Sequence, residues 1–319
     1  MDELGGASHR PDGAGIVGGE ETGWESWRGV VGLLGQVSLC TGALIDPEVV
    51  LTAGHCVYLP EYDVDYTQHP EDVTIVGGAD LFQQSVTLAA VSAGAKHPYW
   101  NGDINQQGAV DLGMLRLSGP LDDVETYLLR EHPHPEVGDE GLIVGYGLFD
   151  PHDDNSAGTH RWGATELLHI YQNLIEIGGE TGTCSGDSGG PLFTRQGGQW
   201  VVTGVNSFVE SYDCPVSGGS WDFNTLGYRD WIEQVLYDWT GHGLPENPGT
   251  DADTDSDSET GTETETDTDS DTESDSDSKS PDADGGAIDV SPPADRGCGC
   301  SAVGVSRHGP ILRMVSLSF

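Results

Sequence analysis

The sequence has 319 residues, and its 54 acidic side chains far outnumber the 12 lysines and arginines, which gives a formal net charge of −42 at pH 7. This balance weighs against nucleic acid as a partner, because phosphate binding depends on basic patches that the chain lacks. No apolar run reaches the roughly 20 residues of a membrane-spanning helix, and the opening MDELGGASHRPDGAG lacks the apolar stretch of a secretory signal peptide.

Short apolar runs separated by turn residues recur through the first part of the chain. In chain order they read VVGLLGQVSL, VVLTAG, VTIVGG, DLGMLRL, GLIVGYG and WVVTGVNSF. Their spacing predicts an all-β barrel or sandwich rather than a parallel α/β sheet. Residues 229–239 differ, because Trp231, Val235 and Trp239 share one helical face and predict an amphipathic helix that closes the domain.

The composition changes sharply after the helix. Residues 250–284 alternate Asp or Glu with Ser or Thr and contain almost no apolar side chain, so this segment cannot offset its ordering entropy and is expected to be disordered. It also lacks the glycine-bearing spacing of a calcium-binding EF-hand loop. We expect a propeptide-like leader (1–15), a globular domain (16–243), an acidic linker that acts as a spacer (244–296) and a cysteine-containing end (297–319).

Six cysteines are present, and four of them lie in the globular part, at positions 40, 56, 184 and 214. An even number suggests disulfide bridges, although counting alone allows three connectivities. The remaining pair, Cys298 and Cys300, is too close in sequence to bridge comfortably.

Three motifs carry the groups that peptide hydrolysis by serine requires. LTAGHC contains His55, VDLGMLRL contains Asp111, and GDSGGP contains Ser188. A serine hydroxyl needs a base, an anion that orients the base, and N–H donors for the oxyanion. We expect the donors to be the backbone N–H groups of Gly186 and Ser188.

With IVGG at residues 16–19, these motifs resemble those of the chymotrypsin/trypsin-like serine proteases, including the order His, Asp, Ser. The resemblance covers roughly residues 16–239. It implies two six-stranded antiparallel β-barrels with a C-terminal helix, and a serine endopeptidase. His55 would be the general base and then acid, Asp111 its orienting anion and Ser188 the nucleophile, as in the triad known from this family. The alternative is an inactive relative displayed as a binding module.

The same resemblance implies the disulfides Cys40–Cys56 and Cys184–Cys214. Such bridges persist in oxidising compartments, so we expect a secreted or cell-surface protein whose true N-terminus, or a signal segment, is missing from the sequence. We also expect a monomer that acts on protein or peptide substrates, without a metal or cofactor.

The IVGG motif implies synthesis as a zymogen. In the resembled family, cleavage frees a new amino terminus that pairs with the aspartate before the nucleophile. Here the bond cut would join Gly15 to Ile16, and the pair would be the Ile16 ammonium and Asp187. Only an ion pair makes the burial of either charge tolerable.

Four residues are expected to form the specificity pocket: Gly182, Ser207, Phe208 and Val209. Ser207 also resembles the serine that supports the buried aspartate of the triad. Glycine at position 182 removes the charge that trypsin-like members keep there, and Val209 narrows the pocket. We therefore expect a non-tryptic preference for small aliphatic residues, with Trp221 as a further side chain that intrudes on the pocket.

The end of the chain, RGCGCSAVGVSRHGPILRMVSLSF, follows the acidic linker. Its Gly-Cys-x-Cys element resembles the C-terminal sorting signals of myxobacterial surface proteins. The membrane helix and arginine cluster that normally follow are absent, which suggests a truncated or degenerate signal. Anchoring or lipidation at Cys298 is the corresponding expectation.

Overall fold

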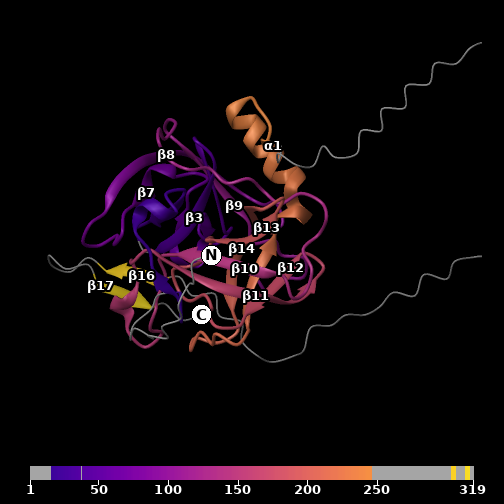
Figure 1. Ribbon diagram of the computed structural model, residues 1–319. Helices are drawn as coiled ribbons and strands as arrows, with labels where there is room; N and C mark the ends of the chain where they lie inside the picture. Colours follow the sequence, from indigo (N-terminus) through magenta and orange to yellow (C-terminus); the bar gives the residue numbers. More distant parts are fainter. Residues whose placement is uncertain (1–15, 37, 246–302, 307–312, 317–319) are drawn as a thin grey trace, which may run out of the picture. The chain divides into compact units, whose positions relative to one another are not determined.

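The computed structural model describes residues 16–36, 38–245, 303–306 and 313–316 (Figure 1). The expected leader, nearly all of the acidic linker, and Cys298 and Cys300 lie outside the described residues.

The first half of the globular domain forms a closed barrel of six antiparallel strands. Its order is β3-β2-β7-β8-β9-β4, and pairing between β3 and β4 closes it. The strands are β2 (Val30–Leu34), β3 (Leu39–Asp46), β4 (Val49–Thr52), β7 (Thr74–Gly77), β8 (Val86–Lys96) and β9 (Gly113–Leu117). Every residue of β3 and β4 is buried.

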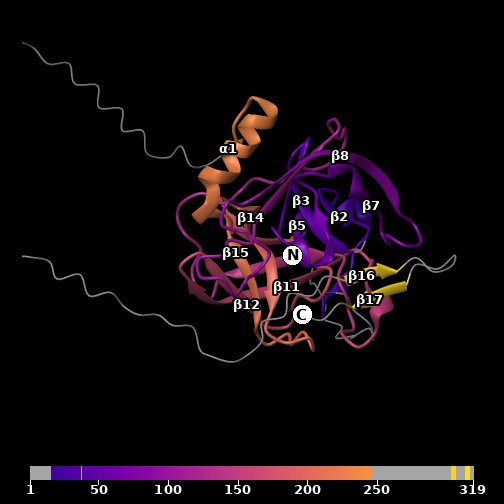
Figure 2. The same ribbon diagram turned by 180° about the vertical axis from the view of Figure 1, so that it is seen from behind.

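The second half forms another closed antiparallel barrel, with the order β11-β10-β13-β14-β15-β12 and closure between β11 and β12 (Figures 1 and 2). Its strands are β10 (Glu140–Gly145), β11 (Arg161–Tyr171), β12 (Leu174–Gly178), β13 (Pro191–Gln196), β14 (Gln199–Val209) and β15 (Ser220–Asn224). Along β11, buried Thr165 and Leu167 alternate with exposed Ala164 and Glu166, because successive side chains of a strand point to opposite faces.

One apolar core joins the two barrels. It contains Leu44 and Leu115 from the first barrel together with Phe193 and Val205 from the second, and β4 lies against β14. The expected fold, with two six-stranded barrels and a C-terminal helix, is confirmed. The functional residues described below lie where the barrels meet.

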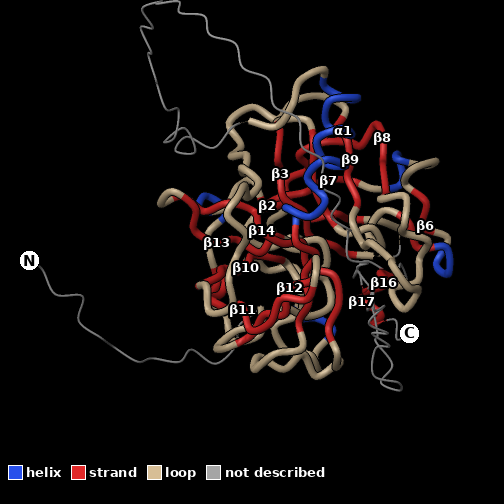
Figure 3. The backbone as a smooth tube through the Cα atoms, turned by 90° about the vertical axis from the view of Figure 1, so that its right-hand side faces the viewer, coloured by secondary structure: helices blue, strands red, loops and turns tan. Residues whose placement is uncertain are grey.

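Helix α1 (Arg229–Thr240) follows the barrels (Figure 3). At its end, Gly241 forms a left-handed C-cap and donates its N–H to the Tyr237 carbonyl. Ile232 and Leu236 are fully buried in the shared core. The tryptophans and valine of the expected helical face, Trp231, Val235 and Trp239, pack beside them and stay half-buried. The helix is therefore rotated by about one residue relative to the sequence expectation.

The remaining elements are short. They are β1 (Glu20–Glu21), β5 (Tyr58–Leu59), β6 (Val64–Asp65), η1 (Trp24–Ser26), η2 (Pro60–Tyr62), η3 (Pro70–Asp72), η4 (Asp154–Ser156), η5 (Thr225–Tyr228), β16 (Val303–Ser306) and β17 (Arg313–Ser316). Strands β16 and β17 pair as a hairpin, and Val303 of β16 pairs with Leu39 of β3. Among the described residues, no helix is both long and apolar enough to cross a bilayer.

Candidate active site

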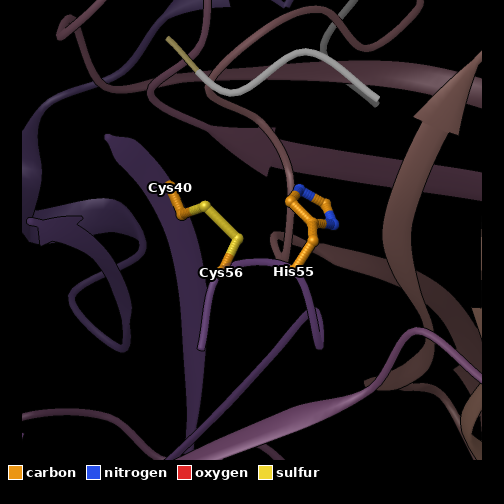
Figure 4. Close-up of side chains that lie close together, drawn as sticks. All are labelled: Cys40, His55 and Cys56. Carbon is orange, nitrogen blue, oxygen red and sulfur yellow. A yellow bond between two sulfur atoms is a disulfide. The ribbon is translucent and has the colours of Figure 1, made fainter. Parts of the chain in front are cut away.

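His55 lies in the tight turn that follows β4. The turn is closed by backbone bonds from Cys56 to Ala53 and from Val57 to Gly54. A disulfide ties the adjacent Cys56 to Cys40 on β3 (Figure 4). The imidazole packs near Trp100, with 6.4 Å between ring centroids. A side chain at position 54 would come within 3 Å of that indole, so the turn requires glycine there.

Asp111 precedes β9 and is fully buried. Its Oδ1 accepts the backbone N–H of His55 at 2.7 Å, and its Oδ2 lies 2.7 Å from His55 Nδ1. Ser207 on β14 donates its hydroxyl to the same Oδ2 at 2.5 Å. Because a carboxylate accepts hydrogen bonds, these contacts place a proton on Nδ1 and leave Nε2 as the basic nitrogen of the ring.

Ser188 lies in the loop between β12 and β13 and is half-buried. Its carbonyl accepts the N–H of Thr41 on β3 at 2.9 Å, and Cys56 Sγ lies 3.5 Å from the same oxygen. Within the described part of the chain, no hydrogen bond joins the Ser188 hydroxyl to His55, and His55 Nε2 has no partner. The loop is nevertheless hydrogen-bonded to β3, which the Cys40–Cys56 disulfide ties to the turn that carries His55.

The backbone before Ser188 has the form of an anion-binding loop. Gly186 adopts a φ of 98°, which favours glycine, and its carbonyl is turned toward the Thr41 hydroxyl at 2.8 Å. The N–H of Asp187 bonds to the Cys184 carbonyl, whereas the N–H groups of Gly186 and Ser188 donate to no described residue. Two such free donors on one loop suit a developing oxyanion.

Asp187 is buried completely beneath this loop. Its oxygens accept the N–H groups of Gly147 at 2.8 Å and Cys184 at 3.0 Å. Burial raises the pKa of Asp187 to about 7, and these two N–H groups oppose the shift only in part. A side chain at Gly145 would overlap the carboxylate, so glycine at the end of β10 makes room for this buried acid.

Ile16 is also fully buried, in the apolar core of the second barrel with Ile143 and Leu192. The next residue, Val17, pairs with Gly182, whose N–H bonds to the Val17 carbonyl at 3.0 Å. The IVGG segment is therefore inserted in the second barrel, next to the segment that leads to Ser188.

A small pocket opens beside Ser188, with a volume of about 20 Å³, which is room for roughly one water molecule. Its lining comprises Thr183, Cys184, Ser185, Ser188, Asn206, Ser207, Phe208 and Val209. A second disulfide joins Cys184 to Cys214. Both disulfides expected from the sequence are therefore present.

Three of the four expected pocket residues line this pocket, and Gly182 does not. A Cβ at Gly182 would instead lie 3.2 Å from the backbone of Pro215 and Val216. Trp221 stacks on Phe208, with 6.1 Å between ring centroids, and donates its indole N–H to Glu210. It is not part of the pocket lining, contrary to the expectation that it intrudes there, because β15 points it away from the buried side of the strand.

Sequence reasoning missed two buried polar residues of this region, Asn206 on β14 and Asp222 on β15. Neither belongs to a motif. The alternation in SWDFN would have placed the polar Asp222 on the exposed face of the strand, so the sequence offered no signal for its burial.

The described residues include one cluster of potential metal ligands, formed by Cys40, His55 and Cys56. Both sulfurs are consumed by a disulfide, and the imidazole is bonded to Asp111. This donor set does not fit a metal, because thiolates are the ligands that metals bind.

Comparison with known proteins agrees with this geometry. Residues 16–232 match the model of the family described as Trypsin. Human chymotrypsin-like elastase family member 3B is 30% identical over 264 residues, covering 69% of this chain and 88% of the relative. Human chymotrypsin-like elastase family member 1 is 29% identical, covering 69% and 92%. Bovine proproteinase E is 28% identical, covering 69% and 94%.

Proposed function

The chain belongs to the trypsin family of serine endopeptidases, and on that premise we propose that Ser188 is its nucleophile, with His55 as base and Asp111 as orienting anion. The observation that carries the proposal is the buried set of hydrogen bonds on Asp111, from His55 Nδ1 and from Ser207. These bonds fix one tautomer and one ring orientation of His55. They also stabilise the imidazolium that forms when His55 takes a proton.

The proposed reaction uses these groups in the following roles. Ser188 Oγ attacks the carbonyl carbon of the scissile bond while its proton passes to His55 Nε2. The carbonyl oxygen becomes an oxyanion and accepts the N–H groups of Gly186 and Ser188. His55 then protonates the leaving amine, and a water molecule, deprotonated by His55, releases the acyl group from Ser188.

Activation by cleavage between Gly15 and Ile16 is part of the proposal, although Gly15 lies outside the described residues. Support comes from the burial of Ile16 and from Asp187, a carboxylate that has only two N–H partners among the described residues. The freed ammonium of Ile16 would pair with Asp187 and hold it ionised. An ordered Asp187 would in turn fix the adjacent Gly186 and Ser188.

For substrate preference, we propose a non-tryptic enzyme that takes side chains of about the size of alanine or valine before the scissile bond. The narrow pocket and the presence of Val209 in its lining support this preference. None of the residues that line the pocket carries a charge, so the lining lacks a partner for lysine or arginine.

We further propose that the enzyme acts outside the cell, since its two disulfides persist best in an oxidising compartment. We also propose that it is a monomer. The proposed organisation retains the leader (1–15), the protease domain (16–243), the acidic spacer (244–296) and a sorting or anchoring segment (297–319). The boundaries and roles of the leader, the spacer and the C-terminal segment are proposed from the sequence.

Labelling by a fluorophosphonate probe tests the nucleophile. The full chain cleaved to begin at Ile16 is expected to be labelled, and Ser188→Ala is expected to lose all labelling while it remains folded by circular dichroism. Ser185→Ala, which changes another serine of the pocket lining, is the matched control and should keep the label. A folded, correctly cleaved wild-type chain that resists the probe would indicate the inactive binding module instead.

A further inference from the structure

Asn206 and Asp222 form an unsatisfied polar pair beside the pocket. They lie directly opposite each other in the antiparallel pairing of β14 and β15, which puts their side chains on the same face of the sheet. Asn206 is 2% exposed and Asp222 is 0% exposed. Both amide atoms of Asn206 and both carboxylate oxygens of Asp222 lack a hydrogen-bond partner among the described residues.

The strand on the other side of Asp222 supplies no polar partner for its carboxyl group. The other cross-strand neighbour of Asp222 is Ile175 on β12, which belongs to the apolar core of the second barrel with Leu192. Burial accordingly raises the pKa of Asp222 well above its usual range. Buried polar groups without partners cost free energy, so a group that supplied the missing hydrogen bonds would be bound favourably.

Asn206 lines the pocket together with Ser188, while its amide atoms are buried and without a partner among the described residues. The pocket lining around Asn206 is largely polar. Thr183, another lining residue, donates its backbone N–H to Ser220 Oγ at 3.3 Å, and Ser220 lies two residues before Asp222 on the same buried face of β15. A side chain that enters beside Ser188 therefore lies next to Asn206, and Asp222 is opposite Asn206 on β15.

The size of the pocket limits what can reach this amide. A volume of about 20 Å³ holds roughly one water molecule, so the polar group that reaches the amide has to be small. A hydroxyl on a short side chain meets both conditions, because it is small and can both donate and accept a hydrogen bond.

We propose that Asn206, which lies opposite Asp222 in the pairing of β14 and β15, is a specificity-determining residue that hydrogen-bonds the hydroxyl of a threonine or serine before the scissile bond. This inference rests on the proposed function and refines its substrate class from small aliphatic side chains to small hydroxyl-bearing ones. Valine has nearly the shape of threonine but leaves the amide unpaired. A site built to bond a hydroxyl discriminates strongly against the analogue that lacks it.

The test uses two peptide p-nitroanilides that differ only in threonine or valine before the scissile bond. With the full chain cleaved at Ile16, we expect kcat/KM to favour threonine by at least about tenfold. Asn206→Leu should bring the ratio close to one, chiefly through loss of threonine cleavage, and Asp222→Asn should reduce it. Asp238→Asn, an exposed acid on α1, is the matched control and should leave the ratio unchanged.

The ratio of kcat/KM for the threonine and valine peptides in the wild-type enzyme tests the inference even if both variants fail to fold. Equal rates for the two peptides, from an enzyme that reacts with a fluorophosphonate, would overturn this inference and leave the proposed function intact. A preference for lysine that Asp222→Asn removes would overturn it in favour of ion pairing. If neither peptide is cleaved, product peptides ending in threonine or valine can be compared by calorimetry on Ser188→Ala. Tighter binding of the threonine product supports the inference, and equal affinities overturn it.

Discussion

His160 precedes β11 and has no exposed surface. It stacks on Tyr146, with 4.7 Å between ring centroids, and lies 5.8 Å from the ring of Trp24. Burial lowers the pKa of His160 to about 3, and the nearby Gly23 backbone opposes the shift only in part. The folded protein therefore holds this imidazole neutral at pH values where an unfolded chain would protonate it.

Replacing His160 with phenylalanine is expected to reduce acid sensitivity. Because the folded pKa lies below the unfolded value of about 6.5, the wild type loses stability as pH falls from about 6.5 toward 3. The loss from this residue amounts to about 3 kcal/mol at pH 4. Urea unfolding of Ser188→Ala and of His160→Phe/Ser188→Ala at pH 4 and pH 7 measures it. The pH-dependent change should be smaller in the second protein by about that amount, and parallel changes would refute the assignment.

Local motifs made some site residues predictable from sequence and left others hidden. His55, Asp111 and Ser188 each lie in a short contiguous motif, and the residue types of these motifs predict a serine protease mechanism. Asn206 and Asp222 become a pair only through the register of β14 and β15, and register depends on turns and bulges far from either residue. The sequence contains no local signal for such a pairing.

At the scale of elements, the two disulfides fix different parts of the site. Cys40–Cys56 joins β3 to the turn that carries His55, across 16 residues of sequence. Cys184–Cys214 joins the loop before Ser188 to the segment after β14, across 30 residues. Only the second has a cysteine in the pocket lining.

Removing each bridge by paired alanine substitutions should separate stability from catalysis. Loop-closure entropy predicts a loss of about 3 kcal/mol for Cys40→Ala/Cys56→Ala and about 4 kcal/mol for Cys184→Ala/Cys214→Ala. Urea midpoints measure these losses. Under conditions where both variants remain folded, the second pair should lose more kcat/KM on small-residue substrates, since it borders the pocket. Equal kinetic losses would show that the second bridge has no particular role in the pocket.

Strand and helix content was readable from the alternation of apolar residues and turns, whereas the exact face of α1 was not. Hydrophobic periodicity predicts burial of tryptophan and isoleucine about equally. In the structure, Ile232 and Leu236 fit into the closed core, and the larger indoles remain at its margin. Packing density selects between such neighbouring faces, and the sequence pattern does not encode it.

At the scale of the whole molecule, Asp187 couples the start of the domain to the nucleophile loop. In the uncleaved chain, the folded pKa of about 7 exceeds the unfolded value of about 3.9. The folded state therefore holds a proton that the unfolded state releases, and stability falls as pH rises from about 4 to about 7. The loss reaches about 4 kcal/mol.

Cleavage before Ile16 is expected to remove most of this loss, because the new ammonium pairs with the carboxylate. Chains beginning at Met1 and at Ile16, both carrying Ser188→Ala to prevent self-digestion, can be unfolded in urea across this pH range. The longer chain should lose more stability on going from acid to neutral pH, and Asp187→Asn should abolish the difference. With Ser188 intact, the longer chain should be weakly active. Full activity from a chain proven to begin at Met1 would contradict this account.

The site is divided between the barrels, with His55 and Asp111 supplied by the first and Ser188 and Ser207 by the second. Neither half contains both the proposed nucleophile and its proposed base. The segment between β9 and β10 connects these halves, so fragments divided there are expected to be inactive apart and active once they reassociate. Activity would then require both fragments to be present. For a protein engineer, dividing the gene there offers a proximity sensor, in which hydrolysis of a chromogenic peptide reports that two fusion partners have come together.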